Sequence, residues 1–354
     1  MNNKKILKKA LPAMIAVGLM SQANAGITLY DQGGTSFSAD GFLNAFYTYQ
    51  DQGDTQTSRV RMGFLPNYIG FNAAKEMDGI TVGARSSFWV TINDVNTDDN
   101  NKTDTGIDVR QFYATVDGDF GQVLFGKDFG LYARSNIFND ELLMGVGLAP
   151  QGTSGTTFGN ITAGYPYANP NAQITYRTPN VNGFQLAAGI LDPNNNGAQN
   201  SKQPRFETEL TYSTDFDGGM FSAWLGGASG KTNDVNARGV AYGAKVGLGG
   251  FALTASGFDQ KGISTAFASD TLLSASKSSG YLVQASYKYN AVKGVLSYGE
   301  TDNKNGTKNN LQGGAVFYDI NSNLKMVAEY STNKLKGSAT PDTDTFAVGA
   351  VFSW

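Results

Sequence analysis

Hydrophobic and polar residues alternate with a period of two along much of the chain. In GYLVQASYKYN, residues 280–290, Tyr281, Val283 and Tyr287 share one parity, while Gln284 and Ser286 share the other. In RFETELTYSTDF, residues 205–216, an apolar face and an acidic face alternate in the same way. Because successive side chains of a strand point to opposite faces, each segment predicts a β-strand with one apolar and one wet face.

The last ten residues, TFAVGAVFSW, form the most hydrophobic of these predicted strands. Phe346, Val348, Phe352 and Trp354 share one parity, whereas the other parity carries small or weakly polar residues. Chain ends are usually polar and poorly ordered, so an aromatic C-terminus indicates that this strand has an apolar environment. Taken alone, the segment also fits a buried strand of a periplasmic β-sandwich.

The connections between the predicted strands alternate strictly between long and short. Short ones such as EMDG, GLGG and YNA alternate with long ones such as NDVNTDDNNKTDTG and GETDNKNGTKNN, which gives eight long and seven short connections and therefore sixteen strands. Short turns at one end and long loops at the other are typical of outer-membrane barrels, and a sandwich has no reason to separate them. We therefore expect an all-β fold, a transmembrane antiparallel β-barrel of 16 strands that the last strand closes against the first.

The first 25 residues have the pattern of a secretory signal peptide. Four lysines precede the apolar run 10–20, and Ala-Asn-Ala at 23–25 provides a small-x-small site for signal peptidase. No later stretch approaches the ~20 apolar residues that a transmembrane helix needs. The expected division is a secretory signal peptide at 1–25 and an outer-membrane barrel at 26–354.

Composition excludes several kinds of chemistry. The chain has no histidine and no cysteine, which removes disulfides, the commonest metal ligand and the Ser-His-Asp triad. The formal net charge is −3 and becomes more negative once the lysine-rich signal peptide is removed, which argues against nucleic acid as a partner. We expect no enzyme activity, no cofactor and no metal site.

Six segments, in order along the chain, carry a family resemblance. They are ITLYDQGGTSFSADGFLNAFYTY, NYIGFNAAKEMDG, DVRQFYATVDGDFGQVLFGKDFG, ITYRTPNVNGFQLAAGI, GGAVFYDINSNLKMVAEYS and the aromatic C-terminus. Together they resemble the general, non-specific trimeric porin family of Gram-negative bacterial outer membranes across essentially all of 26–354. The resemblance implies a multi-pass barrel in the outer membrane of a Gram-negative cell. It also implies a homotrimer that contacts outer-membrane lipid and lipopolysaccharide, and a C-terminal signal at Phe352 and Trp354 that the barrel-assembly machinery reads.

The connection at 128–172 is far longer than the others, and in porins the matching third loop folds into the lumen. Within it, NDELLMG is expected to form a helical turn capped by Asn139. The resemblance would then place Asp140 and Glu141 at the pore constriction. The alternative is that they are first-turn acids stabilised by the helix dipole.

The resemblance also implies a ladder of basic residues on the barrel wall that faces this loop. The matching positions are Arg85, Arg110, Lys127 and Arg177. Arg85 and Arg177 fall on the polar parity of their strands, whereas the parity of Arg110 with Phe112 leaves its direction open. A lipid-facing arginine costs ~2–4 kcal/mol at mid-membrane, so a lumen-facing one is the physical default. The alternative for each is an interfacial or rim charge without a role in permeation.

Two features depart from the family pattern. Tyr68 in NYIGF stands where the second strand usually carries a wall arginine, and Arg59 and Arg61 lie earlier, in the expected first long loop. The acidic, glycine-rich signature of enterobacterial constriction loops is replaced by LLMGVGLAPQGTSG. These departures imply a shortened ladder and a constriction that is less charged or lined by aromatic residues.

The predicted function is a water-filled channel for passive diffusion of small hydrophilic solutes and ions. A substrate-selective porin of sixteen strands stays open as an alternative. Two remote alternatives are an outer-membrane barrel enzyme and an adhesin. The enzyme is remote because catalysis without histidine is restricted to Ser-Lys or paired-acid schemes.

The predicted ion preference weighs acids on polar strand faces, including Glu207, Glu209 and Glu329, and the loop acids Asp140 and Glu141 against basic residues of lumen parity. These basic residues are Arg85, Arg110, Arg177, Lys245, Lys288, Lys293 and Lys325. The balance predicts a weak cation preference that decreases as salt screens the charges.

Overall fold

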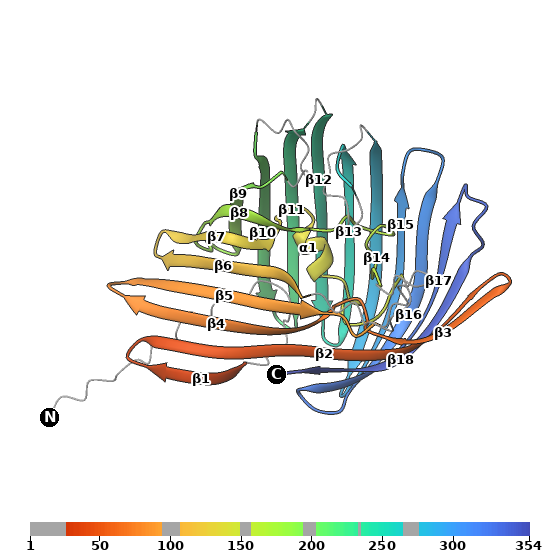
Figure 1. Ribbon diagram of the computed structural model, residues 1–354, viewed down its shortest axis with the longest axis horizontal. Coiled ribbons are helices and arrows are strands. Elements are labelled where there is room, and N and C mark those ends of the chain that lie inside the picture. Colours follow the sequence, from red (N-terminus) through yellow and green to blue (C-terminus); the bar gives the residue numbers. More distant parts are fainter. Residues whose placement is uncertain (1–25, 94–106, 149–156, 194–202, 233–234, 265–275) are drawn as a thin grey trace, which may run out of the picture.

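The computed structural model of the protein describes residues 26–93, 107–148, 157–193, 203–232, 235–264 and 276–354. The expected signal peptide at 1–25 lies outside these residues, as does most of the acidic second loop, 94–106. The described residues form strands and one short helix (Figure 1). None of their helices is both long and apolar enough to cross a membrane.

The strands of the first half are β1 (Ile27–Gln32), β2 (Thr35–Gln52), β3 (Thr55–Arg61), β4 (Asn67–Met77), β5 (Ile80–Val90), β6 (Asp108–Gly118), β7 (Gly121–Phe129), β8 (Pro170–Arg177) and β9 (Phe184–Leu191). Those of the second half are β10 (Arg205–Phe216), β11 (Gly219–Thr232), β12 (Val235–Leu248), β13 (Phe251–Lys261), β14 (Lys277–Tyr289), β15 (Val292–Asp302), β16 (Lys308–Asp319), β17 (Leu324–Lys336) and β18 (Thr343–Ser353). The helix α1 (Arg134–Phe138) lies between β7 and β8. All pairings between these strands are antiparallel, and the pairing of β18 with β2 closes the sheet on itself.

The eighteen strand segments occupy sixteen positions around the barrel. Along one edge of β2, β3 pairs with residues 46–52 and β4 pairs with residues 35–42. Along the other edge, β18 pairs with residues 42–51 and β1 continues the row at residues 35–39. The segments β3 and β4 therefore share one strand position around the barrel, and β1 and β18 share another. The predicted barrel of sixteen strands, closed by the last strand against the first long strand, is confirmed.

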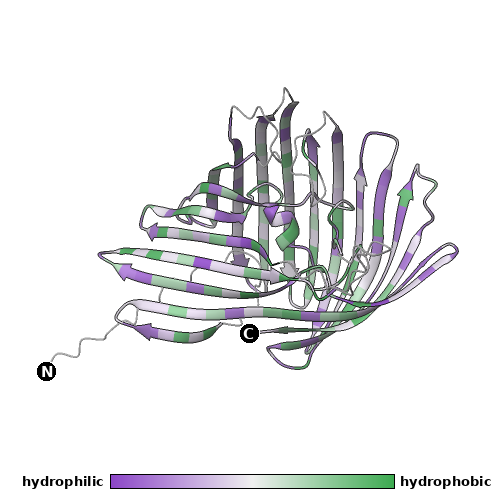
Figure 2. Ribbon diagram, in the orientation of Figure 1, coloured by the Kyte–Doolittle hydropathy of each residue, from purple (hydrophilic) through white to green (hydrophobic). Residues whose placement is uncertain are grey.

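Side chains alternate between the outer and inner faces of the barrel, which gives the strands their banded hydropathy in Figure 2. In β14, Tyr281 and Val283 are 44% and 42% exposed on the outer face, whereas Leu282 and Gln284 are buried on the inner face. The apolar parity of β18, with Phe346 and Phe352, is exposed on the outer face in the same way. Such an apolar outer band is what a strand in contact with lipid requires.

The two ends of the barrel differ as the loop lengths predict. Asp78 and Gly79 alone join β4 to β5, and their φ values of 47° and 85° are typical of a two-residue hairpin turn that favours glycine. Two-residue links also join β10 to β11 and β12 to β13. The longer connections 303–307 and 337–342 lie at the opposite end of the strands.

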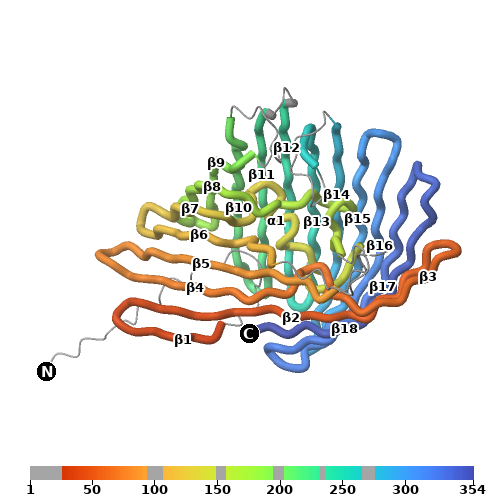
Figure 3. Tube along the Cα trace, in the orientation of Figure 1, coloured from red at the N-terminus to blue at the C-terminus, as the bar shows by residue number. Residues whose placement is uncertain are grey.

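Residues 130–148 and 157–169, together called the inner loop, run inside the barrel. In Figures 1 and 3, α1 lies within the ring of strands, and β2 lies beside β18 at the closure. Ile161 and Tyr165 of the loop are fully buried, in one cluster with the inward-facing Phe46 and Leu282. The burial of apolar surface on both sides stabilises the loop in the lumen. The expected folding of the third long loop into the barrel is confirmed.

The barrel wall is lower where the inner loop begins and ends. The strands β7, β8 and β9 have 9, 8 and 8 residues, whereas β11 and β12 have 14 each. A shorter strand spans less of the barrel axis, because each residue adds only about 3.3 Å. The barrel therefore has one low side and one high side.

Candidate channel lining and its inner loop

Two carboxylates on β10 hold the start of the inner loop. Glu207, on β10, accepts hydrogen bonds from the amide N–H groups of Leu131 at 2.7 Å and Tyr132 at 2.9 Å. Glu209, two residues further along β10, accepts from the amide and the hydroxyl of Ser135 at 3.1 and 2.7 Å. Both glutamates are 2% exposed. Backbone groups that would otherwise lack partners are thus satisfied by charged acceptors.

Glu329, on β17, holds the loop further along the chain. Its two carboxylate oxygens accept from the amide N–H groups of Val146 at 2.8 Å and Gly147 at 2.7 Å. A buried carboxylate needs such donors, because an unpaired charge in this environment is strongly unfavourable. Glu329 is 3% exposed. The three glutamates are therefore covered by the loop that they hold, and do not present their charge to the lumen.

Asp140, expected at the constriction, is buried between the inner loop and the wall. Its carboxylate accepts from Asn160 Nδ2 at 2.9 Å, from the Tyr165 hydroxyl, and from Gln284 Nε2 of β14 at 2.6 Å. Burial and the neighbouring carboxylate raise the pKa of Tyr165 well above its ordinary value, so the hydroxyl stays a donor. Asp140 thus joins two parts of the loop to one strand.

Glu141, the second expected acid, faces another arc of the wall. Its carboxylate pairs with Lys245 of β12 and with Lys293 of β15, the latter at 2.5 Å. The hydroxyl of Ser286 donates to the same carboxylate at 3.3 Å. Burial by itself would raise the pKa of Glu141, but the two ammonium groups outweigh it and lower the pKa. Among the described residues, no group of three or more His, Cys, Asp or Glu side chains could hold a metal ion.

Arg85 lies on the inner face of β5, as its parity predicts. Its Nη1 is 2.7 Å from Asp40 Oδ2 of β2 and 2.7 Å from Asn72 Oδ1 of β4, and its Nε donates to Gln111 Oε1 at 2.9 Å. The side chain is 8% exposed. One arginine therefore connects the inner faces of four strands, and its charge is matched by a single carboxylate.

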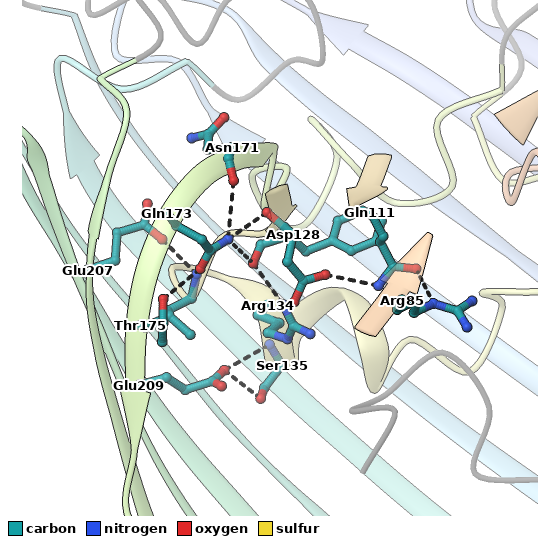
Figure 4. A network of polar contacts seen from close by, with 12 residues as sticks. Arg85, Gln111, Asp128, Arg134, Ser135, Asn171, Gln173, Thr175, Glu207 and Glu209 are labelled. Carbon is teal, nitrogen blue, oxygen red and sulfur yellow. Dashed lines mark hydrogen bonds and ion pairs between the residues drawn. The ribbon is translucent and has the colours of Figure 1, made fainter. Parts of the chain in front are cut away.

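Gln111 extends the contacts of Arg85 into a longer network, shown in Figure 4. Gln111 donates to Asp128 Oδ1 at 2.9 Å, and Asp128 Oδ2 pairs with Arg134 of α1 at 3.2 Å. Arg134 also donates to the carbonyl of Phe129 at 2.8 Å. The sequence reasoning missed Asp128 and Arg134. The available signal was an acid and an arginine at the start of the one exceptionally long connection.

A β-bulge turns Arg110 toward the inside of the barrel. The register of β5 with β6 shifts between Ser87 and Phe88, and Arg110 is the extra residue on β6. Its guanidinium donates to the Tyr167 hydroxyl at 3.3 Å and lies 5.1 Å from the ring of Trp89. Strict alternation would have placed Arg110 on the outer face, but a bulge changes the parity locally.

The other two expected basic positions lie on opposite faces. Arg177 is on the inner face of β8 and donates to Gln185 Oε1 at 3.4 Å. Lys127 of β7 lies directly opposite Phe112 and Ala172 in the pairing with β6 and β8. Directly opposed residues share a face, and Phe112 is 61% exposed on the outer face. Lys127 therefore lies outside the channel, and the prediction that it lines the constriction is wrong.

Tyr68, which replaces the wall arginine of the family pattern, belongs to an aromatic stack on the inner face. Its ring centroid lies 4.6 Å from that of Trp89 and 6.2 Å from that of Phe42. The guanidinium of Arg85 lies 5.9 Å from the Tyr68 ring. All three aromatic side chains are buried. The stack fills space between wall and loop instead of offering an exposed aromatic surface.

Two local predictions were wrong. Asn139 is the C-cap of α1, where its amide and side chain both donate to the Ser135 carbonyl, so it does not begin a helix. Asp140 and Glu141 follow the helix, which also excludes the alternative of first-turn acids. Arg59 and Arg61 belong to strand β3 and not to a loop, because they pair in register with β2 on its inner parity.

Phe352 and Trp354 lie on the outer face where the barrel closes. Phe352 is 42% exposed, and its ring lies 5.5 Å from that of Trp354. The backbone of Trp354 exchanges two hydrogen bonds of 3.1 Å with Gly41 of β2. The last residue is therefore tied into the sheet, with its side chain on the outer parity.

Comparison with known proteins shows what the chain is similar to. The sequence profile of a family described as Gram-negative porin matches residues 10–338, and no curated protein sequence matches the chain. The anion-selective porin from Comamonas acidovorans has a TM-score of 0.69 at 15% identity, covering 90% of this chain and 100% of that chain. Salmonella typhi OmpF, in complex with daunomycin, has a TM-score of 0.65 at 18% identity, with 93% and 100% covered. The trimer form of in-vitro folded OmpT of Vibrio cholerae has a TM-score of 0.56 at 16% identity, with 91% and 100% covered.

Proposed function

Because the chain belongs to the Gram-negative porin family and forms an outer-membrane channel for passive diffusion, we propose that this channel is general for small hydrophilic solutes and ions. The inner loop sets its constriction. The observation that carries this proposal is the fastening of the loop inside the lumen by Glu207, Glu209 and Glu329. A loop held at three places gives the channel a fixed narrow section.

Arg85, Arg110 and Arg177 form the basic side of this section. The support is that each lies on the inner face of its strand or bulge. Asp140 and Glu141 shape the opposite side through the contacts that dock the loop, and not as free negative charge. A sugar-selective channel would need aromatic rings open to the solute, whereas the aromatic stack at Tyr68 is buried, which favours the general channel.

Planar-bilayer recording and liposome swelling with the purified protein test this function. We expect conductance that rises with salt concentration without saturating, and sugar uptake that falls with solute size and not with stereochemistry. Uptake that separates two epimers of equal size would contradict a general channel. A protein that inserts but conducts nothing would contradict the diffusion function itself.

The assembly that we propose is a homotrimer. The trimer form of Vibrio cholerae OmpT shares the fold, and the outer faces of β6 and β7 carry the exposed apolar residues Phe112 and Phe125. Such a patch suits contact with a second copy. Cross-linking in mild detergent should give trimers, and products that stop at monomers would contradict this assembly.

Export and assembly follow from the two ends of the chain. We propose that a signal peptide is removed after Ala25, which the N-terminal mass of the outer-membrane form tests. The aromatic pair Phe352 and Trp354, of which Phe352 is exposed, is the proposed signal for the barrel-assembly machinery. Replacing both by Ala should lower the amount of folded barrel in the membrane, whereas Phe346→Ala, equally exposed on the same face, should not. Lipid and lipopolysaccharide are the proposed contacts of the outer face.

We propose further that the channel has no catalytic activity. The sequence contains no histidine or cysteine, which removes the commonest activated nucleophiles and bases. Hydrolysis of ester or peptide substrates by the purified protein above background would contradict this proposal.

A further inference from the structure

We propose that the inner face of β12–β17 carries an anion path, formed by Lys245, Lys288, Lys293 and Lys325, which binds small oxyanions as they pass through the channel. Phosphate and carboxylate groups are the chemical class that it takes. The inference rests on the proposed diffusion function and adds a preferred class of solute. The lysines lie on β12, β14, β15 and β17, on the wall away from the arginines.

The strand register makes these lysines a continuous set. Lys245 and Lys293 share the carboxylate of Glu141 at the inner loop. Lys288 lies directly opposite Lys293 on the neighbouring strand. Lys288 and Lys325 in turn share the carboxylate of Asp319, the former at 3.0 Å. The set thus runs from the inner loop toward the short turns that follow β14 and β16.

The four lysines and the carboxylates that they contact leave an excess of positive charge. Four ammonium groups share two carboxylates, Glu141 and Asp319. The lysines are also the more accessible partners: Lys293 is 29% exposed against 4% for Glu141, and Lys288 is 42% exposed against 22% for Asp319. An anion in the lumen therefore meets ammonium groups first.

The register brings two of the lysines together at one place on the wall. Like charges directly opposite each other on neighbouring strands are destabilising, and Lys288 faces Lys293 in this way. An ammonium group carries three N–H donors. Lys293 reaches the carboxylate and, at 3.5 Å, the carbonyl of Glu141 and lies 5.6 Å from the Phe317 ring. Lys288 contacts Asp319 at 3.0 Å, so neither lysine uses all three donors. The remaining donors of two facing lysines fit the several oxygens of a phosphate or carboxylate.

The lysines of the anion path also dock Glu141, and a purely structural role is the alternative reading. The two readings differ in what they change: a structural role affects stability, whereas a path affects which ions pass. Other charges contribute to the sign of selectivity, because Glu76, Asp117 and Asp215 share the inner parity at the short-turn ends of β4, β6 and β10. The informative quantity is therefore the shift between variants, and not the sign for the wild type.

The test is a planar-bilayer measurement of reversal potential in a KCl gradient, repeated with inorganic phosphate. In the variant Lys288→Gln/Lys293→Gln, the ratio of chloride to potassium permeability should fall about two- to fivefold at low salt, and less at 1 M. Phosphate should reduce the chloride current of the wild type and have little effect on the variant. Lys334→Gln is the matched control, because Lys334 lies on the outer parity of β17 and pairs with Asp342 at 3.0 Å.

Lys288→Arg keeps the charge and should keep the selectivity, and Lys325→Gln offers a second site if the double variant does not assemble. A variant that conducts with an unchanged permeability ratio and an unchanged phosphate effect would overturn the anion path, even if its thermal stability fell. That result would leave the diffusion function intact. Absence of conductance in the wild type would instead contradict the diffusion function.

Discussion

Beside β2, β5 and β7, the buried Arg85 and Arg134 each have a carboxylate of their own, whereas on the arc formed by β12–β17 four lysines share two. Arg85 pairs with Asp40 and Arg134 with Asp128, and both arginines are less than a tenth exposed. The lysines on the other arc are 16–42% exposed. The first arc is therefore a packed polar wall, and the second is a wall with accessible positive charge.

The comparison teaches that the number of charges in a channel sequence is a poor guide to the charge that a solute meets. The sequence places many acids on inner parities, which predicts a weak cation preference. In the structure, Glu207, Glu209 and Glu329 are covered by the inner loop whose amides they bind. The amides are neutral and do not cancel the charge of these carboxylates, but the loop that covers them keeps a passing ion farther away, and a charge acts more weakly at a greater distance.

The largest effect is expected from removing a carboxylate that holds the inner loop. Glu329→Ala leaves the amides of Val146 and Gly147 without their carboxyl acceptor, which should lower the free energy of unfolding by about 3 kcal/mol. The loop should become less ordered, with noisier and larger single-channel currents. Thermal unfolding in detergent and bilayer recording measure the two effects. Glu300→Ala, whose carboxylate lies near Lys308 and Lys336 on the outer parity, is the control and should change little.

A smaller effect is expected on the packed arginine wall. Arg85→Met removes hydrogen bonds to Asp40, Asn72 and Gln111 and leaves the carboxylate of Asp40 without its cation, which should cost about 2 kcal/mol. The double variant with Asp40→Asn should recover part of this loss, because the unpaired charge is then absent. Denaturant unfolding of the two single variants and the double variant gives the coupling. Strictly additive losses would show that the pair contributes no coupling to this wall.

The aromatic stack beside this wall should contribute less. Tyr68→Leu keeps an apolar side chain but removes the ring contacts with Trp89 and Arg85, at a cost of about 1 kcal/mol. Conductance should stay close to that of the wild type, because the ring is buried. Tyr330→Leu, a change of the same kind on the lipid-facing side, serves as the control. A large rise in conductance for Tyr68→Leu alone would show that the stack borders the open channel.

The smallest effect is expected from pH at the lysine-rich arc. The ion pairs with Lys245 and Lys293 hold the pKa of Glu141 below its ordinary value of 4.5. The stabilisation is therefore present in full above pH 4.5 and is lost as the pH falls through the lowered pKa. Thermal unfolding followed from pH 7 to pH 3 should show this loss in the wild type. Glu141→Gln lacks the titrating group, so an identical pH profile for the variant would contradict the assignment.

Most of the barrel could be predicted from the sequence, because its signal is local. The alternation in β14 and in the last strand identified the outer face residue by residue, and the loop lengths gave the sixteen positions. The inner parity of Arg85 and Arg177 followed from the same rule. The rule failed at Arg110, because a bulge depends on how two strands pair and leaves no period in either one.

The expectations for the residues of the pore constriction were less accurate, because their positions depend on contacts between distant parts of the chain. Lys127 matched a family position, but the register with Phe112 and Ala172 places it on the outer face. Asp140 and Glu141 were correctly assigned to the loop, yet their burial depends on Gln284 and Lys293, more than a hundred residues away. No local pattern relates these positions. Arg134 was missed because its partner Asp128 and the wall around them come together only in the closed barrel.

The sequence by itself determined the strands, their faces, the closure and the family. Side chains on a strand alternate between two faces, and the face that contacts lipid carries apolar residues, so the pattern can be identified along the chain. The tertiary structure alone decided which charges remain exposed. Once the inner loop folds into the lumen, its amide N–H groups donate hydrogen bonds to the carboxylates of β10 and β17. Lys288 and Lys293 remain partly exposed to water. Burial of a charge depends on what packs over it, and that neighbour comes from a distant part of the chain.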